Sequence, residues 1–408
     1  MVEKAEEILT VNSLLEKNGP VCLIIEAHLA PVGGEKRFQP AGFPQIGHVI
    51  YDAPQGENGV EKICIVDSAA SMANHLESLC LVNSHDIALH PDLNGLPYVL
   101  CVTDRKFSPN EDSITLDEND KHDRPVTSTL REGHRIASDY FLDGLIDPQW
   151  VILEEKTKEK DKNKAKKKTS NLSHYWNGPN FRSVLRSKFG LTEIKKNEKY
   201  YTYPESWPSI LSTIFNYDPN SLVHGVLFAK EQIKISRMLT AHMEAFGAKR
   251  VMSSGVKFDP LGKTTSGQPI FSVDEETARD IRATFIIDLA LLRSYGRDNE
   301  IGLNKDQKRL LLELALWKIY RLLEQPFAFR SNCRLQCKAK TVRTEITSHS
   351  DAMPVINIGE ALKACSFTED TDKITKVYYP ADALFKVGKE EESQTNESIM
   401  KVAEKVEE

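Results

Sequence analysis

The segment 255–264 carries residue types that could bind a nucleoside triphosphate, because it ends in the Gly-Lys-Thr of a phosphate-binding P-loop. Such a loop needs a glycine five residues before its Gly-Lys pair, where the chain turns around the phosphates. That position is Lys257, and the earlier Gly255 would make the loop two residues too long. The spacing therefore argues against a nucleoside triphosphatase.

Two His-Asp pairs, at 85–86 and 122–123, could serve metal-dependent phosphohydrolysis. The second pair lies in an acidic loop, and no further His or Asp pair flanks either one at a spacing that would close a metal site. The motifs Gly-x-Ser-x-Gly, His-Glu-x-x-His and Gly-x-Gly-x-x-Gly are missing. We expect no catalytic residue, no metal and no cofactor, although missing motifs do not exclude an enzyme.

Seven cysteines stand at 22, 64, 80, 101, 333, 337 and 365, without a Cys-x-x-Cys pair. Several lie in apolar runs, so we expect reduced thiols that pack as small hydrophobic groups. Cys333 and Cys337 could share one face of an element. Two sulfurs alone do not make a zinc site, which usually takes four ligands.

The elements that must position any site are predicted from the apolar pattern. Apolar runs bounded by turn residues predict strands at 20–31, 63–66, 87–89, 98–103, 222–228, 284–292 and 327–336. Helices are expected at 68–82 and at 304–325, the second apolar almost all round and therefore buried. The segment 36–59 is expected to be a long irregular connection. The fold class is α+β, with long loops.

A third helix is predicted by a capping box, in which Thr129 is the N-cap and Glu132 the reciprocal residue. The face of this helix opposite its apolar side would carry Arg131, Arg135 and Ser138.

The 408 residues, 40% of them hydrophobic, are enough to bury a core. We expect one domain at 1–388, interrupted by a flexible Lys-rich insertion at 154–173, and an acidic, disordered tail at 389–408. No run approaches the ~20 apolar residues of a membrane span, and the N-terminus lacks a signal-peptide pattern. These features favour a cytoplasmic protein that makes no membrane contact.

The net charge of −6 conceals a basic zone. The segments 110–124 and 389–408 each carry a net charge of −4, whereas 154–199 holds fourteen basic and six acidic residues, a net charge of +8. Lys and Arg are the residues that contact phosphates, so the overall acidity does not exclude a nucleic-acid partner.

Six stretches, in this order, resemble the RAMP-superfamily backbone subunit of type I CRISPR Cascade complexes, specifically the Csb-type subunit of subtype I-G, formerly I-U. The stretches are Arg37–Pro40, Asp67–Glu77, Leu96–Tyr98, Ser128–Arg135, Asp288–Gly296 and Phe329–Cys333. The sequence departs from the family at one position, since Arg commonly follows the Asn of the Ala-Asn motif and His75 follows Asn74 here. The Lys-rich insertion is also not expected from the core of the family.

The resemblance implies an RRM-like (ferredoxin-like) palm with inserted finger and thumb elements. It also implies a non-enzymatic subunit that binds the guide (crRNA) without sequence specificity, through phosphates and 2′-hydroxyls, and presents it to target DNA. The expected partners are crRNA, target DNA indirectly through the guide, other copies in a head-to-tail filament and other Cascade subunits. The candidate RNA-binding residues are Lys36, Arg37, Ser71, Asn74, Arg131, His134, Arg135, Arg330 and Arg334.

Each candidate has a simpler alternative role. An exposed Arg is often merely solvated, Asn74 could hydrogen-bond a buried backbone group, and the Lys-rich segment could be a solvated tether. Two other functions also stay open. One is a RAMP-type endoribonuclease that uses His134, His224 or Asp259 beside the scissile phosphate. The other is an unrelated mixed α/β metabolic enzyme.

Overall fold

The computed structural model describes most of the chain between residues 9 and 379. The described residues are 9–43, 47–55, 59–83, 87–103, 124–146, 149–154, 172–196, 199–204, 206–251, 275–297, 301–345, 352–365, 367 and 373–379. The P-loop-like segment, both His-Asp pairs, Asp259, most of the Lys-rich insertion and the acidic tail lie outside these residues.

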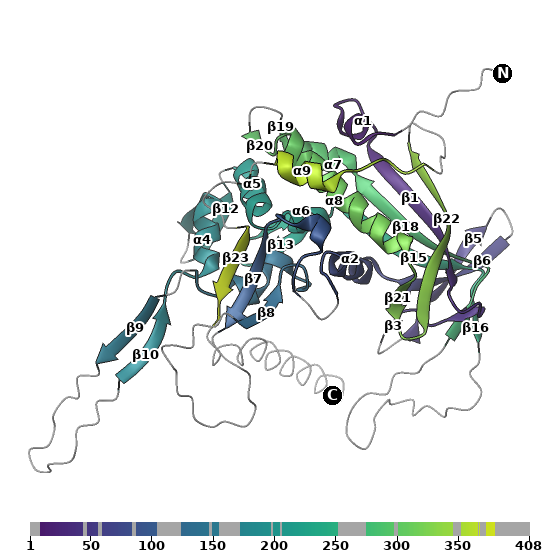
Figure 1. Cartoon of the computed structure of the whole chain (residues 1–408), viewed down its shortest axis with the longest axis horizontal. Coiled ribbons are helices and arrows are strands. Elements are labelled where there is room, and N and C mark those ends of the chain that lie inside the picture. Colours follow the sequence, from purple (N-terminus) through teal and green to yellow (C-terminus); the bar gives the residue numbers. More distant parts are fainter. Residues whose placement is uncertain are drawn as a thin grey trace, which may run out of the picture.

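Seven antiparallel strands form the largest sheet, in the order β21-β22-β1-β18-β15-β6-β5, and the sheet curls along one side of the molecule (Figure 1). Its strands are β1 (Cys22–Pro31), β5 (Ile50–Gln55), β6 (Gly59–Asp67), β15 (Leu239–Phe246), β18 (Asp280–Asp288), β21 (Phe327–Arg330) and β22 (Cys333–Thr344). Every second residue of β15 and β18 is buried, because successive side chains of a strand point to opposite faces. One face of the sheet therefore carries the core.

The two helices α2 (Ala69–Ser78) and α8 (Lys305–Glu324) contact each other, and they pack against β15 and β22, respectively. Along the chain these central elements follow one another as β1, α2, β15, β18, α8 and β22, whereas the strands lie side by side as β22-β1-β18-β15. The predicted α+β class is confirmed.

Helix α8 is the best-predicted element of the fold. Asn304 and Gln307 form a capping box, in which each side chain accepts the other's backbone N–H at 2.9 Å. Leu311 and Leu314 of α8 are fully buried. Three short helices, α1 (Val11–Leu15), α7 (Leu289–Ser294) and α9 (Ile358–Ala364), pack around it. Within the described ranges no helix is both long and apolar enough to cross a membrane.

A long insertion, residues 79–238, separates α2 from β15 along the chain. Its three-stranded sheet has the order β23-β7-β8, and the strand β23, from the far end of the chain, pairs in parallel with β7. The sheet consists of β7 (Tyr98–Thr103), β8 (Arg124–Ser128) and β23 (Ile374–Tyr378). The insertion also holds η1 (Pro91–Leu93), η2 (Arg135–Ala137), α3 (Asp139–Leu142), α4 (Phe181–Lys188), α5 (Trp207–Tyr217) and α6 (Pro219–His224).

Hairpins and a small sheet complete the fold. The hairpins of the insertion are β9 (Gln149–Glu154) with β10 (Leu172–Asn177), β11 (Leu191–Lys196) with β12 (Lys199–Pro204), and β13 (Val226–Phe228) with β14 (Ile233–Ile235). The small sheet has the order β16 (Lys249–Val251), β17 (Glu275–Thr277) and β2 (Arg37–Phe38). The two remaining pairs are β3 (Gly42–Phe43) with β4 (Gly47–His48), and β19 (Gly296–Arg297) with β20 (Ile301–Gly302).

Six element predictions were wrong. The strand expected at 87–89 is only an isolated bridge between Leu81 and Leu89. The segment 36–59 holds four short strands, the predicted strand 222–228 is the end of α6 followed by β13, and the predicted strand 284–292 passes into α7. The predicted strand 327–336 is the hairpin of β21 and β22. The helix expected from Thr129 is a turn, because the hydroxyl of Thr129 accepts the N–H of Val99 at 3.3 Å, on the neighbouring strand β7, instead of capping a helix.

Candidate nucleic-acid interface

Helix α2 lies between the inserted sheet and the hairpin of β21 and β22 (Figure 1). Ser68 is its N-cap, and the Ser68 hydroxyl accepts the N–H of Ser71 at 3.3 Å. Met72 and Leu76 are buried on the inner side, whereas Asn74 is exposed. The exposed side chain of Asn74 therefore does not serve a buried backbone group and faces solvent.

The N-terminal end of α2, called its first end below, is held in place by Asp67, which is fully buried. One Asp67 oxygen accepts Nη2 of Arg330 at 2.9 Å, and the other lies 3.0 Å from Nε2 of His75. Burial alone would raise the pKa of Asp67, but the nearby His75 imidazole and the charge of Arg330 hold it below its ordinary value. Arg330 also donates to the carbonyl of Val66 at 2.9 Å, so it is used within the protein.

The imidazole of His75 is fixed in place by its surroundings. It lies edge-on to the rings of Phe327 and Phe329, with centroid distances of 5.4 and 5.3 Å, and its Nε2 lies 3.3 Å from the hydroxyl of Ser71. Position 75, where the sequence departs from the family, is thus part of a contact between α2 and β21. Ser71 is half-buried in the same contact.

Backbone hydrogen bonds bring three of the distant sequence stretches together here. The N–H of Gln39 donates to the carbonyl of Asn332, and the N–H of Ala41 donates to the carbonyl of Val66, both at 2.9 Å. The stretches 37–40, 67–77 and 329–333 therefore meet at the first end of α2.

Three predicted basic residues of this region are exposed. Nε of Arg37 lies 2.9 Å from a carboxylate oxygen of Glu275, yet the Arg37 side chain is 60% exposed. Lys36 precedes it in the loop, and Arg334 stands on β22 beside the hairpin turn. Because these side chains are already exposed, each could contact a phosphate without first leaving the protein interior.

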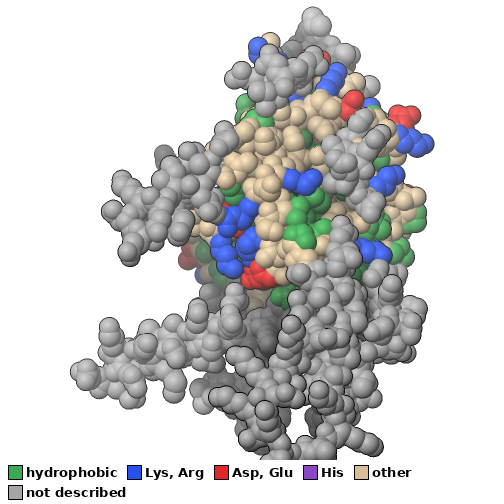
Figure 2. Space-filling model, turned by 90° about the vertical axis from the view of Figure 1, so that its left-hand side faces the viewer, with side chains coloured by type: hydrophobic (Ala, Val, Ile, Leu, Met, Phe, Trp, Pro, Cys, Tyr) green, Lys and Arg blue, Asp and Glu red, His purple; other side chains and the backbone are tan. Residues whose placement is uncertain are grey.

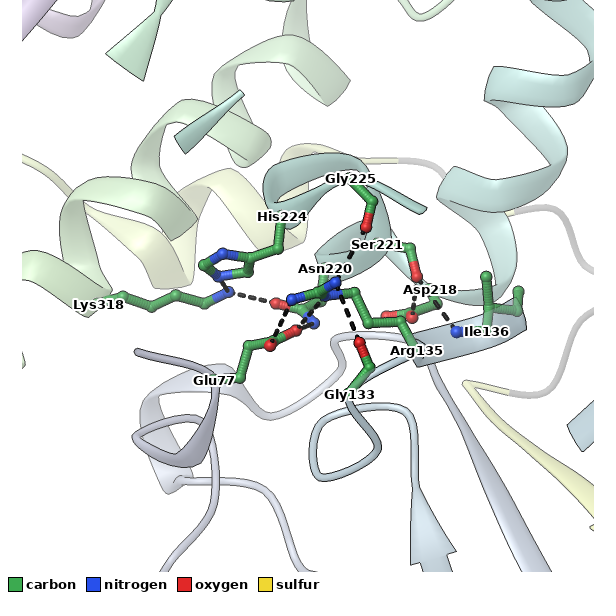
Figure 3. A network of polar contacts seen from close by, with 10 residues as sticks. All are labelled: Glu77, Gly133, Arg135, Ile136, Asp218, Asn220, Ser221, His224, Gly225 and Lys318. Atoms are coloured by element: carbon green, nitrogen blue, oxygen red, sulfur yellow. Dashed lines mark hydrogen bonds and ion pairs between the residues drawn. The ribbon is translucent and has the colours of Figure 1, made fainter. Parts of the chain in front are cut away.

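The other end of α2 is held by Glu77, which is 3% exposed. Nε and Nη2 of Arg135 donate to the two Glu77 oxygens at 2.6 and 2.8 Å, a bidentate pair (Figure 3). Nη1 of Arg135 donates to the carbonyls of Gly133 at 3.3 Å and Gly225 at 3.1 Å. The prediction that Arg135 lies on an exposed face was wrong, because the helix that would have exposed it does not form.

Glu77 also joins Arg135 to a second set of buried polar groups. Asn220 on α6 donates Nδ2 to Glu77 at 2.7 Å and accepts a hydrogen bond from Nζ of Lys318. That Nζ also lies 3.0 Å from Nε2 of His224. Figure 3 shows α2, η2, α6 and α8 each contributing a side chain to this network.

Burial determines the charge state of the network. It lowers the pKa of Lys318, and burial together with the Lys318 charge lowers the pKa of His224 well below its usual value. His224 is therefore neutral, and its Nε2 accepts a hydrogen bond from Nζ of Lys318. Burial also raises the pKa of Asp218 to about 6, against the hydrogen bond that the Ser221 hydroxyl donates at 2.6 Å.

Arg131 and His134 are exposed on the turn between Ser128 and Arg135. Nδ1 of His134 lies 3.4 Å from Glu132, and the His134 side chain is 83% exposed. The structure thus separates the predicted residues into two groups. Lys36, Arg37, Asn74, Arg131, His134 and Arg334 face solvent, whereas Ser71, Arg135 and Arg330 support the fold around α2.

Sequence reasoning missed Asp67, Glu77, Asn220 and Lys318 as the residues that hold α2. Asp67 and Glu77 begin and end one of the six stretches, which is a usable signal. Lys318 is a single cation in the apolar part of α8, so its burial implies a polar partner.

The face in Figure 2, on the α4 side of the molecule, carries Lys and Arg side chains close to Asp and Glu side chains. On this side Arg182 of α4 lies 2.9 Å from Asp139 and 3.0 Å from Asp143. The basic zone predicted at 154–199 is thus partly neutralised where the structure describes it. Among all the residues that the structure describes, no group of three or more His, Cys, Asp or Glu side chains could hold a metal ion.

Comparison with known proteins identifies one family. Residues 23–250 match the family model described as CRISPR-associated protein GSU0053. The crystal structure of Thermofilum pendens Csc2 is 9% identical over 84% of this chain and 70% of that chain, with a TM-score of 0.25, which carries no argument about the fold. None of the curated proteins matches the sequence.

Proposed function

This chain belongs to the CRISPR-associated GSU0053 family, and we propose that it is a non-catalytic backbone subunit of a CRISPR surveillance complex that grips the guide RNA through its sugar-phosphate backbone. The resemblance to the Csb-type RAMP subunit of subtype I-G favours the same function. Such a subunit must leave base edges free for pairing with target DNA, so its contacts should be to phosphates and 2′-hydroxyls.

The observation that carries this proposal is the meeting of four of the six stretches around α2. Asp67 joins α2 to the hairpin of β21 and β22, and Glu77 joins it to the turn at 129–134. The stretch 37–40 reaches the same end as the hairpin. Stretches so far apart in the sequence meet where α2 exposes Asn74, and basic side chains stand at both ends.

The distance between the two ends of α2 suits a backbone-binding track. A helix of 10 residues spans about 15 Å at 1.5 Å per residue. The strands that carry Arg37 and Arg334 are bonded near the N-terminal end of α2, the turn that carries Arg131 and His134 is joined to the other end through Glu77, and Asn74 lies between the two ends. We interpret α2 as the floor of this track.

The order of the central strands supports an RRM-like palm. A ferredoxin-like unit places two helices on one face of a four-stranded antiparallel sheet, with the chain order β-α-β-β-α-β. The elements β1, α2, β15, β18, α8 and β22 follow that chain order, and both helices lie on one face. In this interpretation residues 79–238 are the finger, inserted between α2 and β15.

Copies of the subunit would line up head to tail along one guide, because heterologous contacts that do not close into a ring generate an open helical assembly. Other Cascade subunits would bind at the ends of that assembly, and target DNA would be held through the guide. We propose the cytoplasm as its location.

The rival endoribonuclease has weaker support. His224 is 1% exposed, and its Nε2 is hydrogen-bonded to Nζ of Lys318, so it cannot reach a scissile phosphate. Asp259 lies outside the described residues, and His134 pairs only with Glu132 among the groups placed near it. The family membership removes the unrelated metabolic enzyme from consideration.

The test is purification after co-expression with a CRISPR array, followed by a denaturing gel of the bound nucleic acid. We expect an RNA of uniform, guide-like length that is lost when Arg131→Glu and Arg334→Glu are combined. Lys363→Glu, an exposed residue on α9, is the matched control and should keep the RNA. Protein that carries no RNA, alone and with its neighbouring subunits, would refute the proposal, and accumulating cleavage products would favour the endoribonuclease.

A further inference from the structure

Arg135 combines two features that are rarely found together. Its φ is 54°, in the left-handed region that residues with a Cβ seldom adopt. Its side chain is only 8% exposed, and all of its nitrogens are used in hydrogen bonds to Glu77, Gly133 and Gly225. Strained backbone persists only where the surroundings determine it, so the turn that ends at Arg135 has a fixed shape.

The same turn is fixed at its start. Thr129 is fully buried, its N–H donates to the carbonyl of Val99 at 3.0 Å, and its hydroxyl accepts the N–H of Val99. Within the turn, the N–H of Glu132 donates to the carbonyl of Ser128 at 3.0 Å. Both ends are therefore anchored in the protein, whereas Arg131 and His134 project into solvent between them.

We propose that Arg135 is a positioning residue: through Glu77 it locks the turn 129–134 onto the end of α2, so that Arg131 and His134 meet the same RNA backbone as Asn74. This inference rests on the proposed function. It assigns to the buried network a role in RNA binding, although none of its side chains touches RNA.

The chemistry of the pair suits this role. A guanidinium is planar and presents its donors as a rigid fork, so the two bonds to Glu77 fix its plane and direct Nη1 at the two carbonyls. A lysine at the same position would keep the charge but could not reproduce this geometry. A turn held before binding loses less conformational entropy when RNA arrives, which strengthens binding without adding a contact.

The main variant is Arg135→Lys, measured with a fluorescein-labelled single-stranded RNA over a series of salt concentrations. Losing one charge-assisted phosphate contact should weaken binding about tenfold. It should also reduce the slope of log K against log salt by about 0.7, the value per phosphate on a single strand. We expect Arg131→Ala to do the same, and the double variant to be no weaker than either single variant.

This non-additivity separates positioning from stability. Leu314→Ala destabilises the core of α8 without removing any member of the polar network, so it should leave both the affinity and the salt slope of the folded protein unchanged. Glu77→Gln removes the charge partner but keeps a hydrogen-bond acceptor, so it serves if Arg135→Lys does not fold. It should weaken binding in the same direction by a smaller factor.

A second measurement does not depend on RNA. Amide hydrogen exchange at residues 131–134 should be faster in Arg135→Lys than in the wild-type protein, and unchanged in Leu314→Ala under native conditions. Unchanged exchange, or wild-type affinity and salt slope in folded Arg135→Lys, would overturn the inference and leave the proposed function intact. A wild-type protein that binds no RNA would instead refute the proposed function, and this inference with it.

Discussion

Replacing Asp218 by Asn should stabilise the protein near neutral pH. Asp218 is fully buried, Ser221 donates to one of its oxygens, and the other oxygen has no hydrogen-bond partner within the described part of the chain. Burial raises its pKa from 3.8 to about 6. The folded protein therefore holds this proton more tightly than the unfolded chain does.

The sign of the pH dependence follows from this difference. Stability from Asp218 is fully present below about pH 4 and is lost as the pH rises to about 6, because the folded state must then bury a charge. The loss is about 3 kcal/mol, at about 1.4 kcal/mol for each unit of pKa difference. Asn is neutral throughout and can still accept from Ser221, so Asp218→Asn should avoid this loss.

The assay is urea unfolding of the wild-type protein and Asp218→Asn between about pH 4 and about pH 7. We expect the two to be similar at the acidic end and the variant to be more stable by up to about 3 kcal/mol at the neutral end. Asp52→Asn, whose carboxylate is 59% exposed, is the control and should follow the wild-type profile. If Asp218→Asn destabilises equally at every pH, then Arg135 and Lys318 stabilise the charged form and the reasoning fails.

Two further predictions concern the core and the thiols. Leu314→Ala should lower the free energy of unfolding by about 2–5 kcal/mol, because it leaves a cavity where the fully buried Leu314 side chain of α8 packs. Lys363→Ala, at an exposed position, should change it by less than about 0.5 kcal/mol. Urea unfolding measures both, and equal effects would contradict the packing. Burial raises the pKa of Cys64, Cys101 and Cys333 to about 12, so these thiols should react with a disulfide reagent only after unfolding; fast labelling of the native protein at these positions would refute their burial.

Local sequence patterns were sufficient to predict the helices and strands whose own residues determine where they form. The apolar pattern at 304–325 predicted α8 almost to the residue, and the structure adds a capping box at Asn304. The strand at 20–31 and the helix after Ser68 were confirmed for the same reason. The box at Thr129 misled because a distant strand, β7, offered the hydroxyl another partner, and no local pattern records such a competition.

The site shows the same limit. Resemblance located the stretches that meet at α2, but it did not separate exposed side chains from supporting ones. Arg135 and Arg131 are both arginines in one stretch, and only the long-range pairing of Arg135 with Glu77, 58 residues away, decides that Arg135 is buried whereas Arg131 is exposed. Exposure at such positions depends on tertiary contacts and is not encoded in residue type.

The parallel pairing of β23 with β7 bears on how the chain is made. β7 occupies residues 98–103, whereas its neighbour β23 occupies 374–378, so most of the polypeptide must leave the ribosome before this sheet gains its third strand. Until then one side of β7 presents unpaired backbone groups, and an open strand edge is a template for association with other chains. Synthesis that stops before residue 374 would thus leave a partly folded chain with a persistent open edge, a product that a cell would have to shield with chaperones or degrade.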